Sequence, residues 1–269
     1  MNLPSTTLRV AVLQVSAGSD PEANLRRVEA LWAESGPADL VALPEVMALR
    51  GSDADYRRCA EPIPGPLTER LAGMAARRHA WLLAGSLIEQ TEHGLFNTSI
   101  LFNRDGVRVA AYRKIHLFEA HLESGQVIRE SDTYRAGAQP VLVEVEGWQC
   151  GMAVCYDVRF PELFRHYSAL GAHVLFLPSN FTQRTGRDHW EILVRARAIE
   201  NQCFVVAPDQ CGANPHTGIP SHGHSLVCGP WGEVLAAAAD EETVLRADLD
   251  PVLLEQTRRR VPALQHRRL

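Results

Sequence analysis

Two short stretches of the 269-residue chain are apolar on both alternations of a β-strand, namely LVALPE (40–45) and VLFLPS (174–179). Successive side chains of a strand point to opposite faces of the sheet. A strand in a sheet with one solvent-exposed face therefore alternates apolar and polar residues. A strand whose side chains are apolar on both sides must have both faces of the sheet buried. The chain is thus expected to bury its sheets between other layers.

Helical patterns separate the predicted strands along the whole chain. Single strands are predicted at 8–15, 39–45, 81–90, 173–179 and 203–209. Hairpins are predicted at 96–117, 140–155 and 224–238, and helices at 21–35, 66–80, 161–171, 188–201 and 248–260. The mixture of β-α-β units and hairpins, without a linker or a repeat, predicts one α/β domain with mixed sheets over residues 1–269.

Composition narrows the class of partner. The hydrophobic fraction of 46% and charged fraction of 22% are typical of soluble globular proteins, and the net charge of −5 argues against nucleic acid and anionic membranes as partners. No apolar run approaches the ~18 residues of a membrane span. The six cysteines form no CxxC pair, which favours buried free thiols in a reducing cytoplasm.

The basic residues are almost all of one type. Of the 27 lysines and arginines, 26 are arginine, and the single lysine is Lys114. Biased codon usage accounts for the excess of arginine, but it does not explain why one lysine is kept at position 114. A lone lysine indicates a position where a planar guanidinium cannot replace a compact ammonium, and this favours a functional role.

Three reactive side chains stand at predicted strand ends: Glu45, Lys114 and Cys155. Taken singly, a glutamate after proline is more often a turn residue, and a cysteine in an apolar strand is more often packing. Active sites of α/β folds collect at strand ends, however, and together the three residues provide a base, a cation and a nucleophile. They are the parts needed for acyl transfer.

The chemistry of each part fits that interpretation. A thiol whose pKa is near 8.5 needs a base or a positive neighbour to react at neutral pH. A carboxylate can take its proton and later return it to a leaving amine. The oxyanion of a tetrahedral intermediate needs donors, which an ammonium and a backbone N–H at a strand-to-helix turn can supply.

The stretches LPEVM (43–47), YRKIHLF (112–118) and VCYDVRFPE (154–162) resemble, in this order, the three motifs of the nitrilase superfamily of carbon–nitrogen hydrolases. The resemblance covers nearly the whole chain. It implies a Glu-Lys-Cys triad on a four-layer αββα sandwich that dimerises into an αββααββα unit. It also implies that Glu45 is the general base, Lys114 the oxyanion stabiliser and Cys155 the nucleophile, with the Tyr156 N–H as the second oxyanion donor.

The family also carries a second glutamate between the lysine and the cysteine. Residues 118–140 lose periodicity, and a loop of this length inside a compact domain is usually functional. Two candidates lie there, Glu123 and Glu130. The sequence around Glu130, RESDT with a glycine seven residues after the glutamate, resembles the family pattern, so Glu130 is expected to orient Lys114 or the substrate.

Within the superfamily the chain is most similar to the Nit branch, the amidases that act on deaminated glutathione and the ω-amidases. The resemblance implies a small amide that also carries a carboxylate, and an arginine to bind that carboxylate. Arg159 is a candidate for this role; the alternative is that it braces the cysteine loop through Asp157 or Glu162. The candidates for further substrate contacts are Asn180, Phe181 and His189.

Two further patterns, a His/Cys cluster and a basic C-terminus, are interpreted as structural and not as binding sites. HGHSLVC (222–228) matches no closed zinc pattern, so neither a metal nor any other cofactor is expected. The basic C-terminus includes Arg258–Arg260 and lacks interleaved aromatic residues. This favours a solvated helix end over nucleic-acid binding, with a tail from about 248 to 269 in subunit contact within a homodimer.

Three alternatives to an amidase for deaminated glutathione stay open. The same triad can hydrolyse ω-amides such as α-ketoglutaramate and succinamate, or N-carbamoyl compounds. A chain of this fold can also be a catalytically silent scaffold, although the presence of Glu45, Lys114 and Cys155 argues against that.

Overall fold

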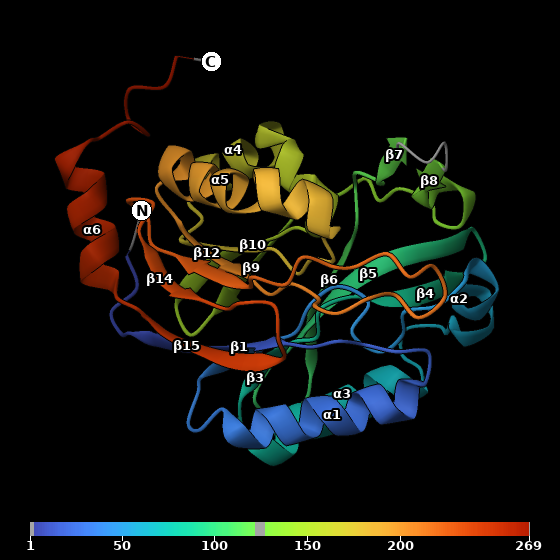
Figure 1. Cartoon of the computed structure of the whole chain (residues 1–269). Helices are drawn as coiled ribbons and strands as arrows, with labels where there is room; N and C mark the ends of the chain where they lie inside the picture. The colour runs from blue at the N-terminus through green and yellow to red at the C-terminus, as the bar shows by residue number, and fades with distance from the viewer. Residues whose placement is uncertain (1–2, 122–126, 269) are drawn as a thin grey trace.

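The computed structural model describes residues 3–121 and 127–268, and in it two β-sheets lie face to face with helices on their outer sides (Figure 1). The seven-stranded sheet has the order β15 (Thr243–Leu249), β1 (Leu8–Gln14), β2 (Leu40–Ala42), β3 (Trp81–Leu83), β5 (Gly94–Phe102), β4 (Leu87–Thr91), and β6 (Arg108–Arg113) also pairs with β5. The six-stranded sheet has the order β14 (Val234–Ala237), β13 (Leu226–Cys228), β12 (Phe204–Ala207), β11 (Val174–Phe176), β10 (Trp148–Met152), β9 (Val141–Val145).

Helices cover each sheet on the side away from the other sheet. The seven-stranded sheet carries α1 (Pro21–Glu34) and α3 (Pro66–Arg78), and the six-stranded sheet carries α4 (Pro161–Ala169) and α5 (Gln183–Asn201) (Figure 1). The remaining helices are α2 (Asp53–Cys59) and α6 (Pro251–Arg260), and β7 (Glu119–His121) pairs with β8 (Val127–Arg129). The fold is the predicted four-layer αββα sandwich with mixed sheets, since β1–β2–β3 and β10–β11–β12 pair in parallel and the other neighbours antiparallel.

Strand β1 shows why both faces of the inner strands are apolar. Leu8, Val10 and Val12 belong to the core between the two sheets. Ala11 and Leu13 point the other way, into a second core beneath α1 and α3. The same division holds for β2, which confirms that strands apolar on both alternations are covered on both faces.

Most predicted elements are present, and their ends differ by a few residues. The predicted strand 81–90 is wrong as one element, because Gly85 breaks it into β3 and β4. Gly85 has φ of 59°, and a Cβ there would lie 1.9 Å from the carbonyl oxygen of Pro44. Only glycine permits this contact, which brings the chain beside the residue that precedes Glu45.

Other differences lie where the pattern is short or polar. Residues 248–249 end strand β15, which the sequence did not predict, and the last helix begins only at Pro251 after the cap of Asp250. Helix α5 begins at Gln183, five residues earlier than predicted, and helix α2 was not predicted. The region expected to be a loop holds the three-residue strands β7 and β8, which are too short to show a period.

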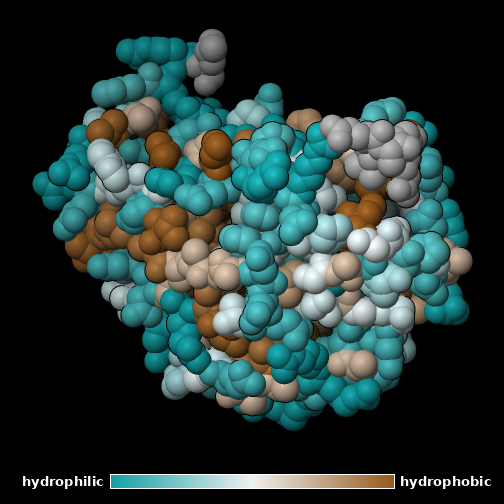
Figure 2. Space-filling model, in the orientation of Figure 1, coloured by the Kyte–Doolittle hydropathy of each residue, from teal (hydrophilic) through white to brown (hydrophobic). Residues whose placement is uncertain are grey.

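Exposed apolar side chains lie on α5 and on the β13–β14 hairpin, whose turn contacts the last helix. Ile192 and Ile199 lie on the outer side of α5, and Trp231 and Val234 belong to the turn and strand β14; the side chain of Ile192 is 70% exposed. Ile199 packs against the turn that carries Trp231, and the guanidinium of Arg260 in α6 lies 5.1 Å from the Trp231 ring. Figure 2 shows hydrophobic surface over α6 and β14. These four apolar residues are called the apolar face below.

None of the helices within residues 3–121 and 127–268 has the length and apolar character needed to cross a membrane.

Close packing under α4 generates a stability prediction. A Cβ at Gly151 in β10 would lie 2.6 Å from the ring of Tyr167, whose hydroxyl accepts a hydrogen bond from Val141 N at 3.1 Å and so ties β9 to this ring. We expect Gly151→Ala to lower the free energy of unfolding in urea by about 1–3 kcal/mol, because overpacking forces the ring and strands apart.

Gly73→Ala is the matched control. Gly73 lies inside α3, where a Cβ would meet only the end of the flexible Arg77 side chain, at 3.1 Å. Alanine stabilises a helix interior by up to about 1 kcal/mol relative to glycine. Equal effects of the two substitutions would contradict the packing described for Gly151.

Candidate active site

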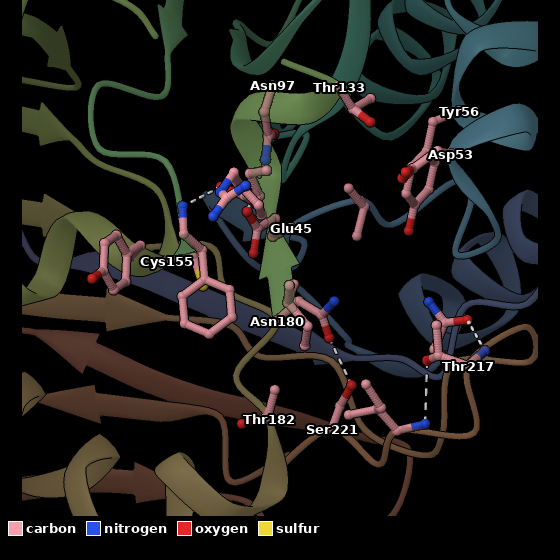
Figure 3. A pocket seen from close by; sticks show the side chains of 18 of the residues that line it. Glu45, Asp53, Tyr56, Asn97, Thr133, Cys155, Asn180, Thr182, Thr217 and Ser221 are labelled. Atoms are coloured by element: carbon pink, nitrogen blue, oxygen red, sulfur yellow. Dashed lines mark hydrogen bonds between the residues drawn. The ribbon is translucent and has the colours of Figure 1, made fainter. Parts of the chain in front are cut away.

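The ends of several strands open into one cavity of about 380 Å³ (Figure 3). Glu45 follows β2, Cys155 follows β10 and Asn180 follows β11, so the two sheets both contribute to its wall. The other lining residues include Tyr56 from α2, Glu130 and Tyr134 from the segment after β8, Arg159 from the turn after β10, Phe181 from the segment after β11, and Thr217 and Ser221 from the loop before β13. The cavity is large enough for a small organic molecule.

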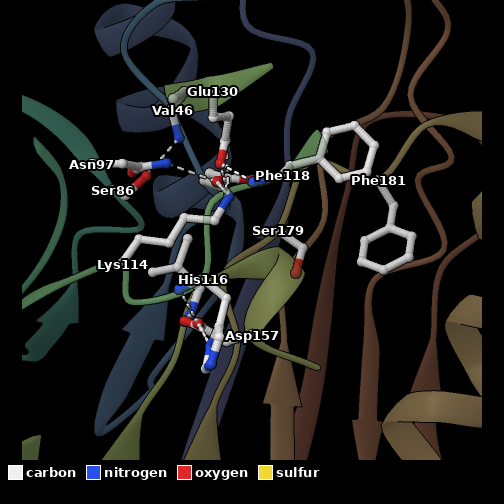
Figure 4. Close-up of polar contacts among 12 residues, drawn as sticks. Val46, Ser86, Asn97, Lys114, His116, Phe118, Glu130, Asp157, Ser179 and Phe181 are labelled. Atoms are coloured by element: carbon white, nitrogen blue, oxygen red, sulfur yellow. Dashed lines mark hydrogen bonds and ion pairs between the residues drawn. The ribbon is translucent and has the colours of Figure 1, made fainter. Parts of the chain in front are cut away.

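Lys114 stands at the centre of a buried ion cluster (Figure 4). Its Nζ donates to Oε1 of Glu45 at 2.9 Å and to Oε1 of Glu130 at 2.9 Å, and its side chain is fully buried. The other oxygen of Glu130 accepts the backbone N–H of Phe118 at 2.7 Å. Because buried charges are stable only when paired and hydrogen-bonded, the three side chains form one unit.

Glu45 is held from three sides. Asn97 in β5 donates through Nδ2 to Glu45 Oε1 at 2.8 Å, and the carbonyl of Asn97 accepts the backbone N–H of Lys114 at 2.8 Å. Gln210 donates to the backbone carbonyl of Glu45 at 2.9 Å, and the Glu45 N–H donates to the carbonyl of Ser179 at 3.3 Å. These bonds fix both the carboxylate and its backbone, and two of them reach across to the other sheet.

Cys155 sits on a strained turn. Its φ is 47°, in the left-handed region that residues other than glycine rarely adopt, and its N–H donates to the carbonyl of Pro178 at 2.9 Å. Such strain costs about 1–3 kcal/mol and persists only where the surroundings enforce it. The 3₁₀ turn Cys155–Arg159 and helix α4 follow at once, so the sulfur is presented where the strand ends.

Asp157 enforces that turn. Its carboxylate is fully buried and accepts the N–H of Val154 at 2.8 Å, the hydroxyl of Tyr112 at 2.8 Å and the N–H of His116 at 3.0 Å. The ring Nδ1 of His116 lies 2.7 Å from the same carboxylate. Asp157 therefore fastens the cysteine turn to the end of β6, from which Lys114 comes.

The protonation states follow from burial and charge. Burial disfavours the ammonium of Lys114, but the carboxylates of Glu130 and Glu45 outweigh it and hold the pKa of Lys114 well above its usual range. Burial, reinforced by the charge of Glu45, raises the pKa of the Cys155 thiol well above its usual value, against the opposing effects of Lys114 and the Asn180 N–H. At neutral pH the site thus holds an ammonium and a neutral thiol.

Burial also raises the pKa of Glu130, with Lys114 acting in the opposite direction. The protonated and charged forms of Glu130 are therefore closer in free energy than for an exposed glutamate.

Among the described residues two arginines line the cavity: Arg129, which is paired with Glu119, and Arg159. The guanidinium of Arg159 lies 5.7 Å from the Tyr156 ring and 5.5 Å from the Phe181 ring, and its Nη1 is 3.3 Å from Nδ1 of His189. No carboxylate of the described residues is paired with it. Asp157, which sequence analysis considered as a partner for Arg159, is instead occupied by residues of the β6 end.

The structure brings most predicted site residues together. Glu45, Glu130, Cys155, Tyr156, Arg159, Asn180 and Phe181 all line the cavity, and Lys114 lies directly behind Glu45 and Glu130. His189 is exposed on α5 beside Arg159 and is not among the residues that line the cavity. Glu123 falls outside the described residues.

Sequence reasoning missed the residues that hold the site in place, namely Asn97, Tyr112, His116, Asp157 as an anchor, Gln210 and Ser221. Asn97 is an amide inside the apolar strand pattern FNTSILF, and Gln210 is an amide directly after the predicted strand 203–209; a buried amide needs partners. That signal marks them as structural but does not say which residues they contact.

Comparison with solved structures agrees with this architecture. The chain matches Saccharomyces cerevisiae Nit3, a member of branch 10 of the nitrilase superfamily, with a TM-score of 0.89 and 31% identity over 100% of this chain and 99% of that one. It also matches a variant of the amidase from Nesterenkonia sp. AN1, with a TM-score of 0.77 and 26% identity over 100% of this chain and 97% of that one. In that structure the acetamide moiety of fluoroacetamide is covalently attached to the active-site cysteine.

Sequence relatives point the same way. The chain is 38% identical over 264 residues to a deaminated glutathione amidase of Synechocystis sp., covering 96% of this chain and 97% of the relative. It is 36% identical over 262 residues to an omega-amidase of Xenopus tropicalis, covering 97% and 95%. Residues 9–259 match the family model of carbon-nitrogen hydrolases. With this fold and this match over most of its length, the chain belongs to the carbon–nitrogen hydrolase family, the nitrilase superfamily.

Proposed function

We propose that the protein is an amidase that hydrolyses a small carboxylate-bearing amide through a thioester on Cys155. The observation that carries the proposal is the buried ammonium of Lys114, held at 2.9 Å from both Glu45 and Glu130 at the end of the cavity where Cys155 sits on a strained turn. A base, an oxyanion donor and a nucleophile therefore meet at one place.

Acylation begins with the thiol. Glu45 takes the proton of Cys155 as the sulfur attacks the amide carbon, and the C–N bond becomes part of a tetrahedral intermediate. The oxyanion is stabilised by the ammonium of Lys114 and the backbone N–H of Tyr156. Glu45 then gives its proton to the departing nitrogen, so ammonia leaves and a thioester of Cys155 remains.

Deacylation repeats the chemistry with water. Glu45 removes a proton from water, the resulting hydroxide attacks the thioester carbon, and the proton passes to the sulfur as the C–S bond breaks. The product is the free carboxylic acid, and Cys155 returns to its thiol form. Glu130 and the Asn97 side chain keep Lys114 and Glu45 in position through both halves.

The substrate part of the proposal rests on Arg159. A guanidinium on the cavity wall that lacks a carboxylate partner among the described residues can bind a substrate carboxylate. Deaminated glutathione is the substrate we favour, supported by the name of the Synechocystis relative. ω-Amides such as α-ketoglutaramate or succinamate are the second candidate, favoured by the Xenopus relative, and N-carbamoyl compounds a third. The intact ion cluster argues against a silent scaffold.

We further propose that residues 1–269 form one domain that works as a homodimer in the cytoplasm. The apolar face lies beside α6, so a second copy that covers it would also contact the tail from about 248 to 269. Exposed apolar patches that are rimmed by polar residues commonly mark protein contacts.

Ammonia release tests the amidase. We expect wild-type protein to release ammonia from deaminated glutathione faster than from α-ketoglutaramate or an N-carbamoyl amino acid. Cys155→Ala should abolish release with an unchanged urea midpoint, since alanine keeps the backbone and removes the sulfur. Mass spectrometry should find an acyl adduct on Cys155 of the wild type. Undiminished turnover in Cys155→Ala would refute the thioester.

Lys114→Arg tests whether the site needs a lysine ammonium or only a positive charge. It keeps the charge, but the side chain is fully buried between two carboxylates at 2.9 Å, and a planar guanidinium does not fit where an ammonium does. We expect a rate reduced far more than tenfold, which corresponds to about 1.4 kcal/mol in barrier. A rate within tenfold of wild type would contradict the role given to Lys114.

Titration of Cys155 tests the electrostatics of the site. Burial and the charge of Glu45 raise the thiol pKa, so the thiolate should form only at pH values above the usual range of cysteine. Glu45→Gln removes a negative neighbour, which favours the thiolate, and the midpoint should therefore move to lower pH while turnover is lost. The measurement is the ultraviolet absorbance of the thiolate, with Cys155→Ala variants subtracted. A midpoint that moves upward would overturn this assignment.

Light scattering after size-exclusion chromatography tests the dimer. Wild-type protein should have twice the chain mass, and the double variant Ile192→Asp, Ile199→Asp should be a monomer, because it places two charges in the apolar face. Val107→Asp is the control, since Val107 is also an exposed, β-branched apolar residue but lies in the turn before β6. A dimeric double variant would exclude this face as the interface.

A further inference from the structure

Arg50 is a buried cation whose hydrogen-bond acceptors within residues 3–121 and 127–268 are all neutral groups. It lies between β2 and α2, is fully buried, and donates to the backbone carbonyls of Ala17 at 2.7 Å and Cys211 at 2.9 Å. Its two other partners are the hydroxyls of Ser16 at 3.1 Å and Ser221 at 2.7 Å. Within the described residues no carboxylate is paired with it, so its charge acts on the hydrogen bonds around it.

The contact with Arg50 determines the direction of the next hydrogen bond. A guanidinium can only donate, so Ser221 Oγ accepts from Arg50 and keeps its own proton for another acceptor. That acceptor is Oδ1 of Asn180, at 2.6 Å (Figure 3). If the Asn180 amide were turned round, Ser221 would receive two donors and its proton would lose this acceptor. The order Arg50 to Ser221 to Asn180 therefore fixes which end of the amide faces the serine.

The other end of the amide is then Nδ2, which carries two N–H donors. Asn180 lines the cavity, as do Cys155, Arg159 and Phe181. It is also close to the sulfur, because its backbone N–H favours the thiolate of Cys155. The wall of the cavity on this side thus offers the Asn180 amide N–H groups and the Arg159 guanidinium, both of which are donors.

We propose that Arg50 and Ser221 are positioning residues that hold Asn180 with its N–H groups toward the cavity, where they recognise an oxygen acceptor on the acyl chain of the substrate. The proposal rests on the amidase function proposed above and narrows its substrate class. An amide whose acyl chain ends in a carboxylate binds to the donors of Asn180 and Arg159. An amide of equal length with an apolar end gains no affinity from these donors.

Ser221 is the residue whose substitution best tests the chain of hydrogen bonds from Arg50 to Asn180. Arg50 also holds the Ala17 carbonyl, the Ala17 N–H donates to Oε1 of Gln210 at 3.0 Å, and Gln210 binds the backbone of Glu45. A change of Arg50 would therefore disturb the proposed base as well as Asn180. Removing the Ser221 hydroxyl frees the Asn180 amide and takes one acceptor from Arg50. The bond from Arg50 to Ala17, and with it the Gln210 branch, stays in place.

The test uses succinamate and butyramide, two amides of equal chain length of which only the first carries a carboxylate. Binding is measured by calorimetry in a Cys155→Ala background, and turnover as ammonia release with Cys155 present. Ser221→Ala should weaken succinamate binding and raise its KM about tenfold, as expected for a lost hydrogen bond to a charged group, with kcat nearly unchanged. Butyramide should respond little.

Three variants control the experiment. Ser221→Thr keeps a hydroxyl and should restore succinamate binding. Asn180→Asp should weaken it more than Ser221→Ala does, because a carboxylate then faces a carboxylate. Ser168→Ala removes a buried hydroxyl in α4 that bonds the carbonyl of Asn201, away from this wall, and should change neither amide.

The outcomes separate this inference from the proposed function. Unchanged succinamate binding in Ser221→Ala overturns the positioning role even if the enzyme turns over both amides. Weakened binding without any turnover in the wild-type protein supports the positioning role and refutes the amidase. Parallel losses for succinamate and butyramide also overturn the inference, since they indicate general disruption of the cavity.

Discussion

The buried ammonium of Lys114 is the interaction on which the site depends. It is removed from water and stabilised by two carboxylates, Glu45 from the end of β2 and Glu130 from the segment after β8. Because loss of either partner would leave a charge buried without compensation, three distant segments of the chain must meet for any of them to be stable there. Burial raises the pKa of the Cys155 thiol, and the negative Glu45 that pairs with Lys114 adds to that rise.

The two sheets supply different parts of the site, so their contact is a functional element of the fold. Glu45 and Lys114 come from the seven-stranded sheet, and Cys155 and Asn180 from the six-stranded sheet. Side-chain hydrogen bonds cross between them, from Tyr112 to Asp157 and from Gln210 to the backbone of Glu45. The apolar layer between the sheets sets their spacing, and these polar bonds at its edge set the position of the reacting groups.

Local signals predicted that the inner strands are covered on both faces and drew attention to Lys114, whereas the four layers and the roles of the site residues were implied by the resemblance to the nitrilase superfamily. A strand that is apolar on both alternations predicts cover on both faces, and a single lysine in an arginine-rich chain is conspicuous by itself. Ser221 left no such signal, since its role depends on a contact with Asn180 across 41 positions of chain. Gly85 likewise looks like any glycine in a strand until the carbonyl of Pro44 is found against it. Pairings of this kind are properties of the folded chain and are absent from any local pattern.

The protonated resting state of Cys155 has a consequence for oxidative damage. Peroxides attack the thiolate much faster than the thiol, and sulfinic and sulfonic acids formed on a cysteine are not returned to the thiol by ordinary reductants. Burial and the neighbouring carboxylate keep Cys155 as a thiol. In the proposed scheme Cys155 gives up its proton only as a substrate carbonyl arrives to accept the sulfur. The arrangement therefore protects the proposed nucleophile from oxidation between turnovers.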